Sequence, residues 1–138
     1  MSNGLDLLTA DHQVVNELFA EIEISGDGAV IGQIVDALKA HDDAEHAVLY
    51  PTCARLISDD GLLARCEAAH SAVKRQIDLL VGLEGPPFVQ AAQDLRVLVA
   101  NHVEEEENKL FPKLSDAATA LQLEALGARL LQAKQRGG

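Results

Sequence analysis

Two eleven-residue segments of this sequence repeat a pattern of histidine, glutamate and proline. Residues 41–51 read HDDAEHAVLYP, and residues 102–112 read HVEEEENKLFP. Both have His first, Glu fifth, Leu ninth, an aromatic residue tenth and Pro eleventh. On a helix, residues i and i+4 share a face roughly 6 Å apart, so the His and Glu of each segment can reach a common centre. Imidazole nitrogens and carboxylate oxygens at this spacing are typical metal ligands.

The second segment contains four consecutive glutamates, residues 104–107, and such a run taken alone is typical of a solvated helix face. The apolar stripe at three- and four-residue steps runs from Leu98 through His102 and Glu106. We therefore predict that Glu106 points inward, whereas the other three glutamates lie off the stripe.

Each of the four longest predicted helices carries a polar group at one level of its apolar stripe. The groups are His12, His41 with Glu45, His70, and His102 with Glu106. A lone core histidine is usually satisfied by a hydrogen bond, and a surface pair of His and Glu is also common. Burying all six groups without partners would be costly, because one neutral polar group already costs about 1–3 kcal/mol. A metal ion offsets that cost, so these six residues are the predicted ligands.

The spacing of these residues indicates a duplication. His102 follows His41 by 61 residues, and His70 follows His12 by 58. The near-equal offsets predict two related helical hairpins. Six mixed nitrogen and oxygen donors suit two iron or manganese ions better than one tetrahedral zinc ion, and the many imidazoles favour iron.

Turn-forming residues divide the chain into helices that position these groups. Breaks are predicted at 25–29 (SGDGA), 58–61 (SDDG) and 82–87 (GLEGPP). The predicted helices are therefore about 5–24, 30–57, 60–82, 88–111 and 116–135. The expected fold is all-α: an antiparallel up-down-up-down four-helix bundle over about 5–111 with an additional C-terminal helix, in a single domain over 1–138.

Two local features refine these boundaries. Pro51 should kink the second helix or end it early, because proline lacks the backbone N–H of a helix interior. A final helix beginning near residue 116 could be capped by Ser115 or Asp116.

Composition narrows the functional classes. The net charge of −11 weighs against nucleic acid or an anionic membrane as a partner. No segment has the roughly 18 uninterrupted apolar residues of a membrane span, and no signal peptide is recognisable, so we predict a cytoplasmic protein. Cys53 and Cys66 lack CxxC spacing and are expected to be reduced thiols.

The motifs together resemble the haemerythrin-like, or HHE cation-binding, family over about residues 5–135. They are DH at 11–12, HDDAEHAVLYP, AAH at 68–70 and HVEEEENKLFP. The resemblance implies a four-helix bundle around two non-haem iron ions with an oxo or hydroxo bridge. It implies that His12 and His41 hold one iron and that His70 and His102 hold the other. Glu45 and Glu106 would bridge the two.

The sequence departs from oxygen-carrying members of that family. They have a further histidine one turn after the ligand on the third helix, where this chain has Lys74. Glu67 could instead fill a vacant position or accept a hydrogen bond from a ligand. Tyr50 is predicted either to pack in the core or to supply a phenol close to the metals. His46 is expected near the ligands or at the surface.

Three functions fit this pattern. The first is an enzyme that turns over a small oxidant such as hydrogen peroxide, with nitric oxide as a further candidate substrate. The second is reversible binding of dioxygen, and the third is sensing or storage of iron or oxygen. Apolar residues that lie on no predicted stripe, such as Leu7, Val14 and Val97, leave room for a homodimer interface.

Overall fold

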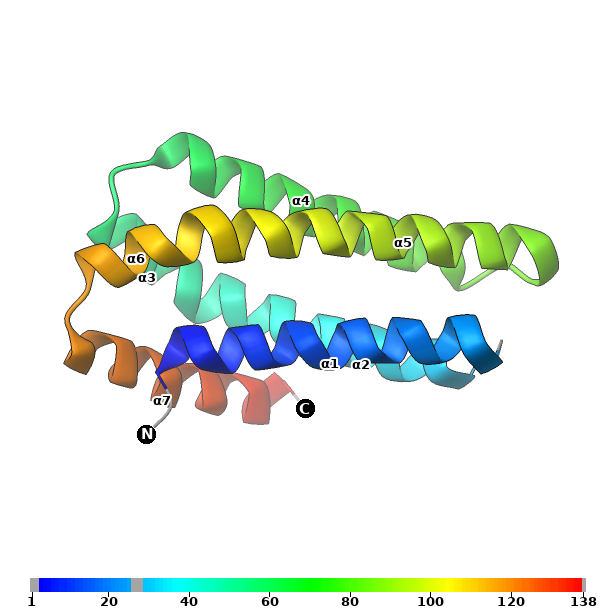
Figure 1. Ribbon diagram of the computed structural model, residues 1–138, viewed down its shortest axis with the longest axis horizontal. Helices are drawn as coiled ribbons and strands as arrows, with labels where there is room; N and C mark the ends of the chain where they lie inside the picture. The colour runs from blue at the N-terminus through cyan, green and yellow to red at the C-terminus, as the bar shows by residue number, and fades with distance from the viewer. Residues whose placement is uncertain (1–2, 26–28, 138) are drawn as a thin grey trace. The chain divides into compact units, whose positions relative to one another are not determined.

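Most residues are helical in the part of the chain that the computed structural model describes, residues 3–25 and 29–137 (Figure 1). No strand occurs within those ranges. In sequence order the described elements form five helical stretches, which agree in number with the five predicted segments and confirm the all-α class. The fourth stretch continues to Ala117 instead of ending near residue 111. The elements are α1 (Gly4–Ser25), α2 (Ala29–Ala44), η1 (Glu45–Leu49), α3 (Tyr50–Leu56), α4 (Asp60–Leu80), α5 (Gly85–Glu105), η2 (Glu106–Leu110), α6 (Phe111–Ala117) and α7 (Ala120–Gly137).

The helices belong to two compact units. The terminal unit comprises Met1–Ser58 with Phe111–Gly138, and the middle unit comprises Asp59–Leu110. The single domain over 1–138 stays a prediction.

In the terminal unit, α1 and α2 run side by side in opposite directions (Figure 1). Helix α7 packs against both of them. The contact with α1 is close, because a Cβ atom added at Gly4 would lie 2.5 Å from Cγ of Leu126. Apolar side chains on one face of α7 are buried, whereas Leu121 and Leu131 are exposed. The buried leucines of α7 are Leu123, Leu126 and Leu130.

In the middle unit, α4 and α5 form the second antiparallel pair (Figure 1). On α4 the apolar residues at three- and four-residue steps from Leu63 to Leu80 are all buried, as is His70 among them. On α5 the stripe differs by one residue from the prediction. Val99, three residues before His102, is buried, whereas Leu98, four residues before it, is only partly buried. The side of α5 that carries Val99 therefore lies closer to the core.

The predicted breaks around α4 are confirmed. Residues 57–59 are not helical, and the Asp59 side chain accepts a hydrogen bond from the Leu62 N–H at 3.0 Å, which caps α4. Helix α5 begins at Gly85, earlier than predicted, with prolines in its first turn, where a missing N–H costs nothing. Gly85 has φ of 64°, a conformation that glycine adopts without strain. The break at 25–29 falls largely on 26–28, outside the described residues.

The predicted cap of the final helix is wrong. Ser115 and Asp116 lie inside α6, and α7 begins after Thr119. The Thr119 hydroxyl accepts from the Gln122 N–H at 3.1 Å, and the Gln122 side chain accepts from the Thr119 N–H at 2.8 Å. This reciprocal pair is a capping box, which satisfies two N–H groups instead of one.

Pro51 does not end the second helical stretch early, because α3 continues to Leu56. The chain instead forms a π-helical turn, η1, immediately before α3, where the Tyr50 N–H bonds to the Glu45 carbonyl. The second copy of the motif has the same feature, η2, immediately before Phe111 and Pro112. In a regular α-helix a proline ring clashes with the carbonyl four residues earlier, and a wider turn relieves that clash. Both π-turns begin at the predicted glutamate ligand.

None of the described helices is both long enough and apolar enough to span a bilayer.

Candidate metal centre

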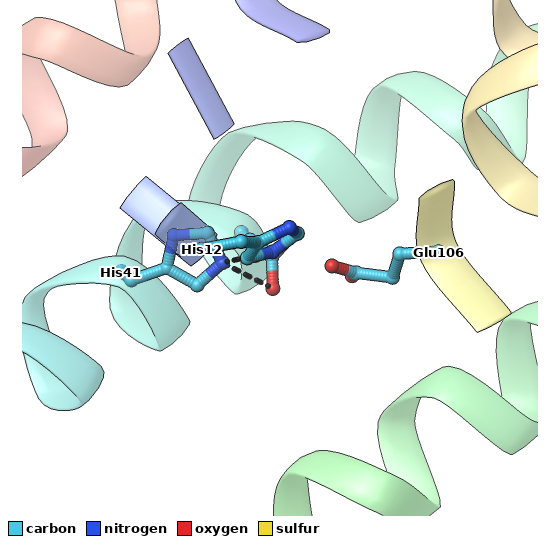
Figure 2. Close-up of side chains that lie close together, drawn as sticks. His12, His41 and Glu106 are labelled. Atoms are coloured by element: carbon cyan, nitrogen blue, oxygen red, sulfur yellow. Dashed lines mark hydrogen bonds and ion pairs between the residues drawn. The ribbon is translucent and has the colours of Figure 1, made fainter. Parts of the chain in front are cut away.

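The terminal unit brings together three of the predicted ligands. His12 on α1 and His41 on α2 approach through their Nε2 atoms at 3.2 Å, with the rings edge to face (Figure 2). One helical turn after His41, the Glu45 carboxylate lies 3.2 Å from His41 Nε2. All three side chains are buried, and Glu45 is fully inaccessible to solvent. We call His12, His41 and Glu45 the terminal cluster.

The middle unit contains the corresponding set. His70 on α4 and His102 on α5 approach through Nε2 at 2.8 Å, again edge to face. Glu106 begins η2, and one of its carboxylate oxygens lies 3.3 Å from His102 Nε2. Its side chain extends away from its own helix (Figure 2) and is fully buried. We call His70, His102 and Glu106 the middle cluster.

Hydrogen bonding to the His41 ring sets its tautomer. Asp11, beside His12 in the sequence, has a carboxylate oxygen 3.0 Å from His41 Nδ1. A carboxylate only accepts, so Nδ1 carries the proton of the neutral ring and Nε2 carries the lone pair. That lone pair lies 3.2 Å from a Glu45 oxygen, and two such acceptors repel unless a proton or a cation lies between them.

The donor set of each cluster fits a metal ion. In both, two Nε2 atoms and a carboxylate oxygen lie within 4.8 Å of one another on buried side chains. Imidazole and carboxylate are ligands for iron, manganese and zinc. The arrangement can therefore hold a cation through three protein donors in each unit.

A lysine from the C-terminal helix holds the carboxylate that contacts His41. Lys134 Nζ on α7 lies 2.6 Å from Asp11 Oδ1 and 2.7 Å from Oδ2. Burial alone would raise the pKa of the Asp11 carboxyl, but hydrogen bonds from His41 and Lys134 and the positive charge of Lys134 lower it below its usual value. Asp11 is therefore ionised at neutral pH.

Two aromatic residues occupy the tenth position of the repeated motif. Phe111 stacks on the His12 ring, with centroids 6.0 Å apart and planes 7° from parallel. Tyr50 is buried and meets the His46 ring edge to face at 5.3 Å. His46 itself is exposed, which agrees with the surface alternative.

The side chain of Glu67 does not join the middle cluster. It is exposed on α4, whereas His70 three residues later is buried. Lys74 is also exposed. In the acidic run, Glu106 is buried, Glu104 is exposed, and the other two are partly exposed, as the stripe predicts. Cys53 and Cys66 are buried free thiols.

Sequence reasoning missed the supporting residues and the π-turns. Asp11 could have been noticed, because it precedes a predicted ligand in the DH motif. Lys134 has no such signal, since it lies 123 residues from its partner. The two prolines signalled a helix irregularity but not its form.

The chain belongs to the family described as "Hemerythrin HHE cation binding domain", whose model matches residues 3–114. The family assignment and the buried clusters together define a cation-binding helical domain.

Two known proteins are similar along almost the whole chain. A protein of Nostoc sp. (strain PCC 7120) named "DNA nickase" is 31% identical over 140 residues. That match covers 97% of this chain but only 40% of the nickase. The crystal structure of an HHE domain-containing protein from Mycobacterium kansasii superposes with a TM-score of 0.86 at 21% identity. It covers 99% of this chain and 88% of that one, so the fold is a haemerythrin-like helical bundle.

Proposed function

We propose that this chain binds two non-haem iron ions and uses them to react with a small oxidant, hydrogen peroxide above all. The observation that carries the proposal is the duplicate set of buried donors. Each unit presents two imidazole nitrogens and one carboxylate at matching spacing. Membership of a cation-binding family supports the same interpretation.

The ligand assignment follows the clusters. His12 and His41 would hold one iron, and His70 and His102 the other. Three donors per cluster fall short of the five or six that iron prefers, so shared carboxylates would raise the ligand number. We therefore propose Glu45 and Glu106 as bridging ligands, with an oxo or hydroxo bridge completing the centre.

The chemistry divides between the metal and the protein. Bound iron would supply the Lewis acidity and the reversible change of oxidation state for disproportionation of peroxide, in which a second peroxide is the electron donor. Peroxide reduction would instead take its electrons from a co-substrate such as nitric oxide. The histidines would remain neutral and present Nε2. Buried apolar residues such as Leu8 and Leu95 would exclude bulk water from the donors. Tyr50 would donate a hydrogen bond or an electron from its phenol. Its counterpart in the repeated motif, Phe111, stacks on His12, which supports a role near a ligand.

Lys74 favours turnover over oxygen carriage. Reversible carriage requires one iron with all its positions filled, and in oxygen-carrying relatives a histidine occupies this place in the sequence. Lys74 has an exposed side chain and offers no imidazole. A coordination position would then remain open on each iron, which suits activation of an oxidant.

The test combines metal content and turnover. The iron-loaded protein should contain two iron atoms per chain and should consume hydrogen peroxide catalytically. His70→Ala and Glu106→Ala should abolish consumption, whereas Glu104→Ala, a matched change of an exposed residue, should not. One zinc ion per chain, or no tightly held metal, would exclude the di-iron proposal.

Reversible oxygen binding is the second candidate, and it is favoured by the resemblance to oxygen-carrying haemerythrins. The reduced protein exposed to oxygen would then show a stable visible band that disappears under vacuum. That result would replace the enzyme proposal. Iron uptake without either response would indicate storage or sensing.

The name of the Nostoc relative raises DNA as a substrate, but it describes a much longer protein. The net charge of −11 disfavours binding to phosphate backbones, so we propose no nucleic-acid and no membrane partner. Supercoiled plasmid should stay intact with this chain under conditions where iron is loaded.

A homodimer remains a proposal. Val14 and Val97 are 50% and 59% exposed and would be candidates for its interface. Light scattering would measure the mass in solution.

A further inference from the structure

We propose that Lys134 is a positioning residue for the terminal cluster: acting through Asp11, it fixes the orientation and tautomer of His41, so that the C-terminal helix sets metal affinity there. The inference rests on the proposed function, because it assumes that the cluster binds metal. It extends that function to a helix beyond residue 114, where the family match ends.

The first step is the contact between Lys134 and Asp11. The Lys134 ammonium reaches both carboxylate oxygens, at 2.6 and 2.7 Å, and the two side chains are 33% and 22% exposed. A charge-assisted contact to both oxygens restricts rotation of the carboxylate far more than one neutral hydrogen bond would. Asp11 is therefore held in one orientation.

The second step is the contact between Asp11 and His41. Oδ2, one of the oxygens held by Lys134, lies 3.0 Å from His41 Nδ1. It accepts the Nδ1 proton, so the lone pair of Nε2 is directed to the side of the ring where His12 and Glu45 lie. Carboxylates that orient a ligating histidine in this way also raise its basicity.

The third step is the place of Lys134 in the fold. Helix α7 contacts α1, α2 and η1, which carry His12, His41 and Glu45 respectively. Leu126 and Leu130 on α7 are almost completely buried, and Leu126 lies against Gly4. The lysine therefore projects from a helix that is docked on the elements of the terminal cluster, and its position is set by their packing.

The second of the two related helical hairpins has no carboxylate at the position that corresponds to Asp11. Residue 69, which precedes His70 as Asp11 precedes His12, is alanine and has no carboxylate. The effect of Lys134 should accordingly be confined to one of the two metal equivalents.

The experiment measures metal affinity directly. The metal-free full chain is titrated with Co²⁺ under anaerobic conditions, and the visible bands of the bound ion are recorded for each equivalent. Lys134→Met should weaken one equivalent about 10-fold or more and alter its bands, while the other stays unchanged. Lys134→Arg should restore most of the affinity. Arg129→Met, which removes a positive charge from an exposed site on the same helix, should bind both equivalents normally.

A double-mutant cycle tests the route through Asp11. Asp11→Asn should weaken the same equivalent, and adding Lys134→Met to it should cause little further loss. His41→Ala identifies that equivalent, because it should remove it. Thermal unfolding of each metal-free variant records any loss of stability separately, and Asp11→Asn carries the test if Lys134→Met does not fold.

Two results would overturn the inference while leaving the proposed function intact. One is wild-type affinity for both equivalents in Lys134→Met, with or without a lower unfolding temperature. The other is a full, additive effect of Lys134→Met in the Asp11→Asn background. A wild-type chain that binds no Co²⁺ and no iron would overturn the proposed function, and this inference with it.

Discussion

The terminal and middle clusters are two versions of one ligand arrangement. Their His–His Nε2 distances are 3.2 and 2.8 Å, and their His–Glu contacts are 3.2 and 3.3 Å. In both, the glutamate begins a π-turn and is fully buried. They differ in the residues that support the histidines. In the terminal cluster Asp11 contacts His41 and Lys134 contacts Asp11, whereas the residue before His70, which corresponds to Asp11, is Ala69.

The difference separates two kinds of constraint. The ligands must converge on one point, which fixes residue types and the i, i+4 spacing in both copies. A residue that supports a ligand can lie on any helix that packs nearby. The terminal cluster can therefore have a supporting residue on α7 although its ligands are the same as those of the middle cluster. Duplicated sites can therefore share ligands and still differ in metal affinity.

Loss of a ligand histidine should have the largest effect on the metal content of either cluster. His41→Ala should eliminate the metal equivalent of the terminal cluster, and His102→Ala that of the middle cluster, because each removes one of two imidazoles. Elemental analysis after iron loading measures the result. His46→Ala is the control, since His46 is exposed, and it should keep full metal content. Loss of metal in His46→Ala would show that the ligands were misassigned.

Substitution of the buried glutamates should have the next largest effect. Glu45→Gln and Glu106→Gln remove a charge from fully buried sites at almost unchanged volume. Metal content should fall, because a neutral amide is a weaker ligand than a carboxylate, and the stabilisation of the protein by iron should fall with it. Elemental analysis after iron loading and thermal unfolding with and without iron measure the two effects. Glu104→Gln, at an exposed position, should change neither. Equal effects at all three positions would contradict the assignment of the helix face.

Docking of α7 in the terminal unit can be disturbed directly. Gly4→Ala would set a methyl group 2.5 Å from Cγ of the buried Leu126 and should destabilise the fold by about 1–3 kcal/mol. Gly32→Ala is the control, because a Cβ there meets nothing within 4 Å, and it should stabilise α2 by about 0.5–1 kcal/mol. Chemical denaturation measures both. Equal stability of the two variants would mean that α1 and α7 are not in close contact.

Each unit has a helix cap that can be removed, with a smaller expected effect on stability. Thr119→Ala in the terminal unit and Asp59→Ala in the middle unit should each cost about 1 kcal/mol, because each cap satisfies N–H groups at a helix start. Only the Thr119 change weakens α7, so only it should also lower Co²⁺ affinity. A loss of affinity in Asp59→Ala would show that the metal equivalents respond to stability in general.

The smallest effect is expected at an exposed ion pair. Arg65 donates to Glu105 at 2.8 Å in the middle unit, and the hydrogen bond from Arg65 lowers the pKa of Glu105. Arg65 is exposed, and pairs of this kind contribute little in water. Arg65→Ala should leave both the midpoint of denaturation and metal affinity unchanged, in contrast to Lys134→Met. A large loss of metal would show that ion pairs support both clusters.

The sequence by itself determined the helical class, the approximate helices and the two sets of three buried His and Glu residues. Local rules act on these features. The apolar stripe selects which side of a helix is buried, so Glu106 could be separated from Glu104, and i, i+4 spacing joins each His to its Glu. Turn residues marked the start of α4, because Asp59 caps the helix by accepting a hydrogen bond from the N–H of Leu62, only three residues later.

Only the tertiary structure decided the features that depend on residues far apart in the chain. The contact between Asp11 and Lys134 spans 123 positions, and no periodicity connects them. The choice between a broken helix and a π-turn at Pro51 depends on whether residues beyond the proline gain more by staying helical. Cys53, beyond the proline, is fully buried, and Val48, Leu49 and Tyr50 before it are buried as well. Continuing the helix therefore keeps apolar surface buried that an early end would expose.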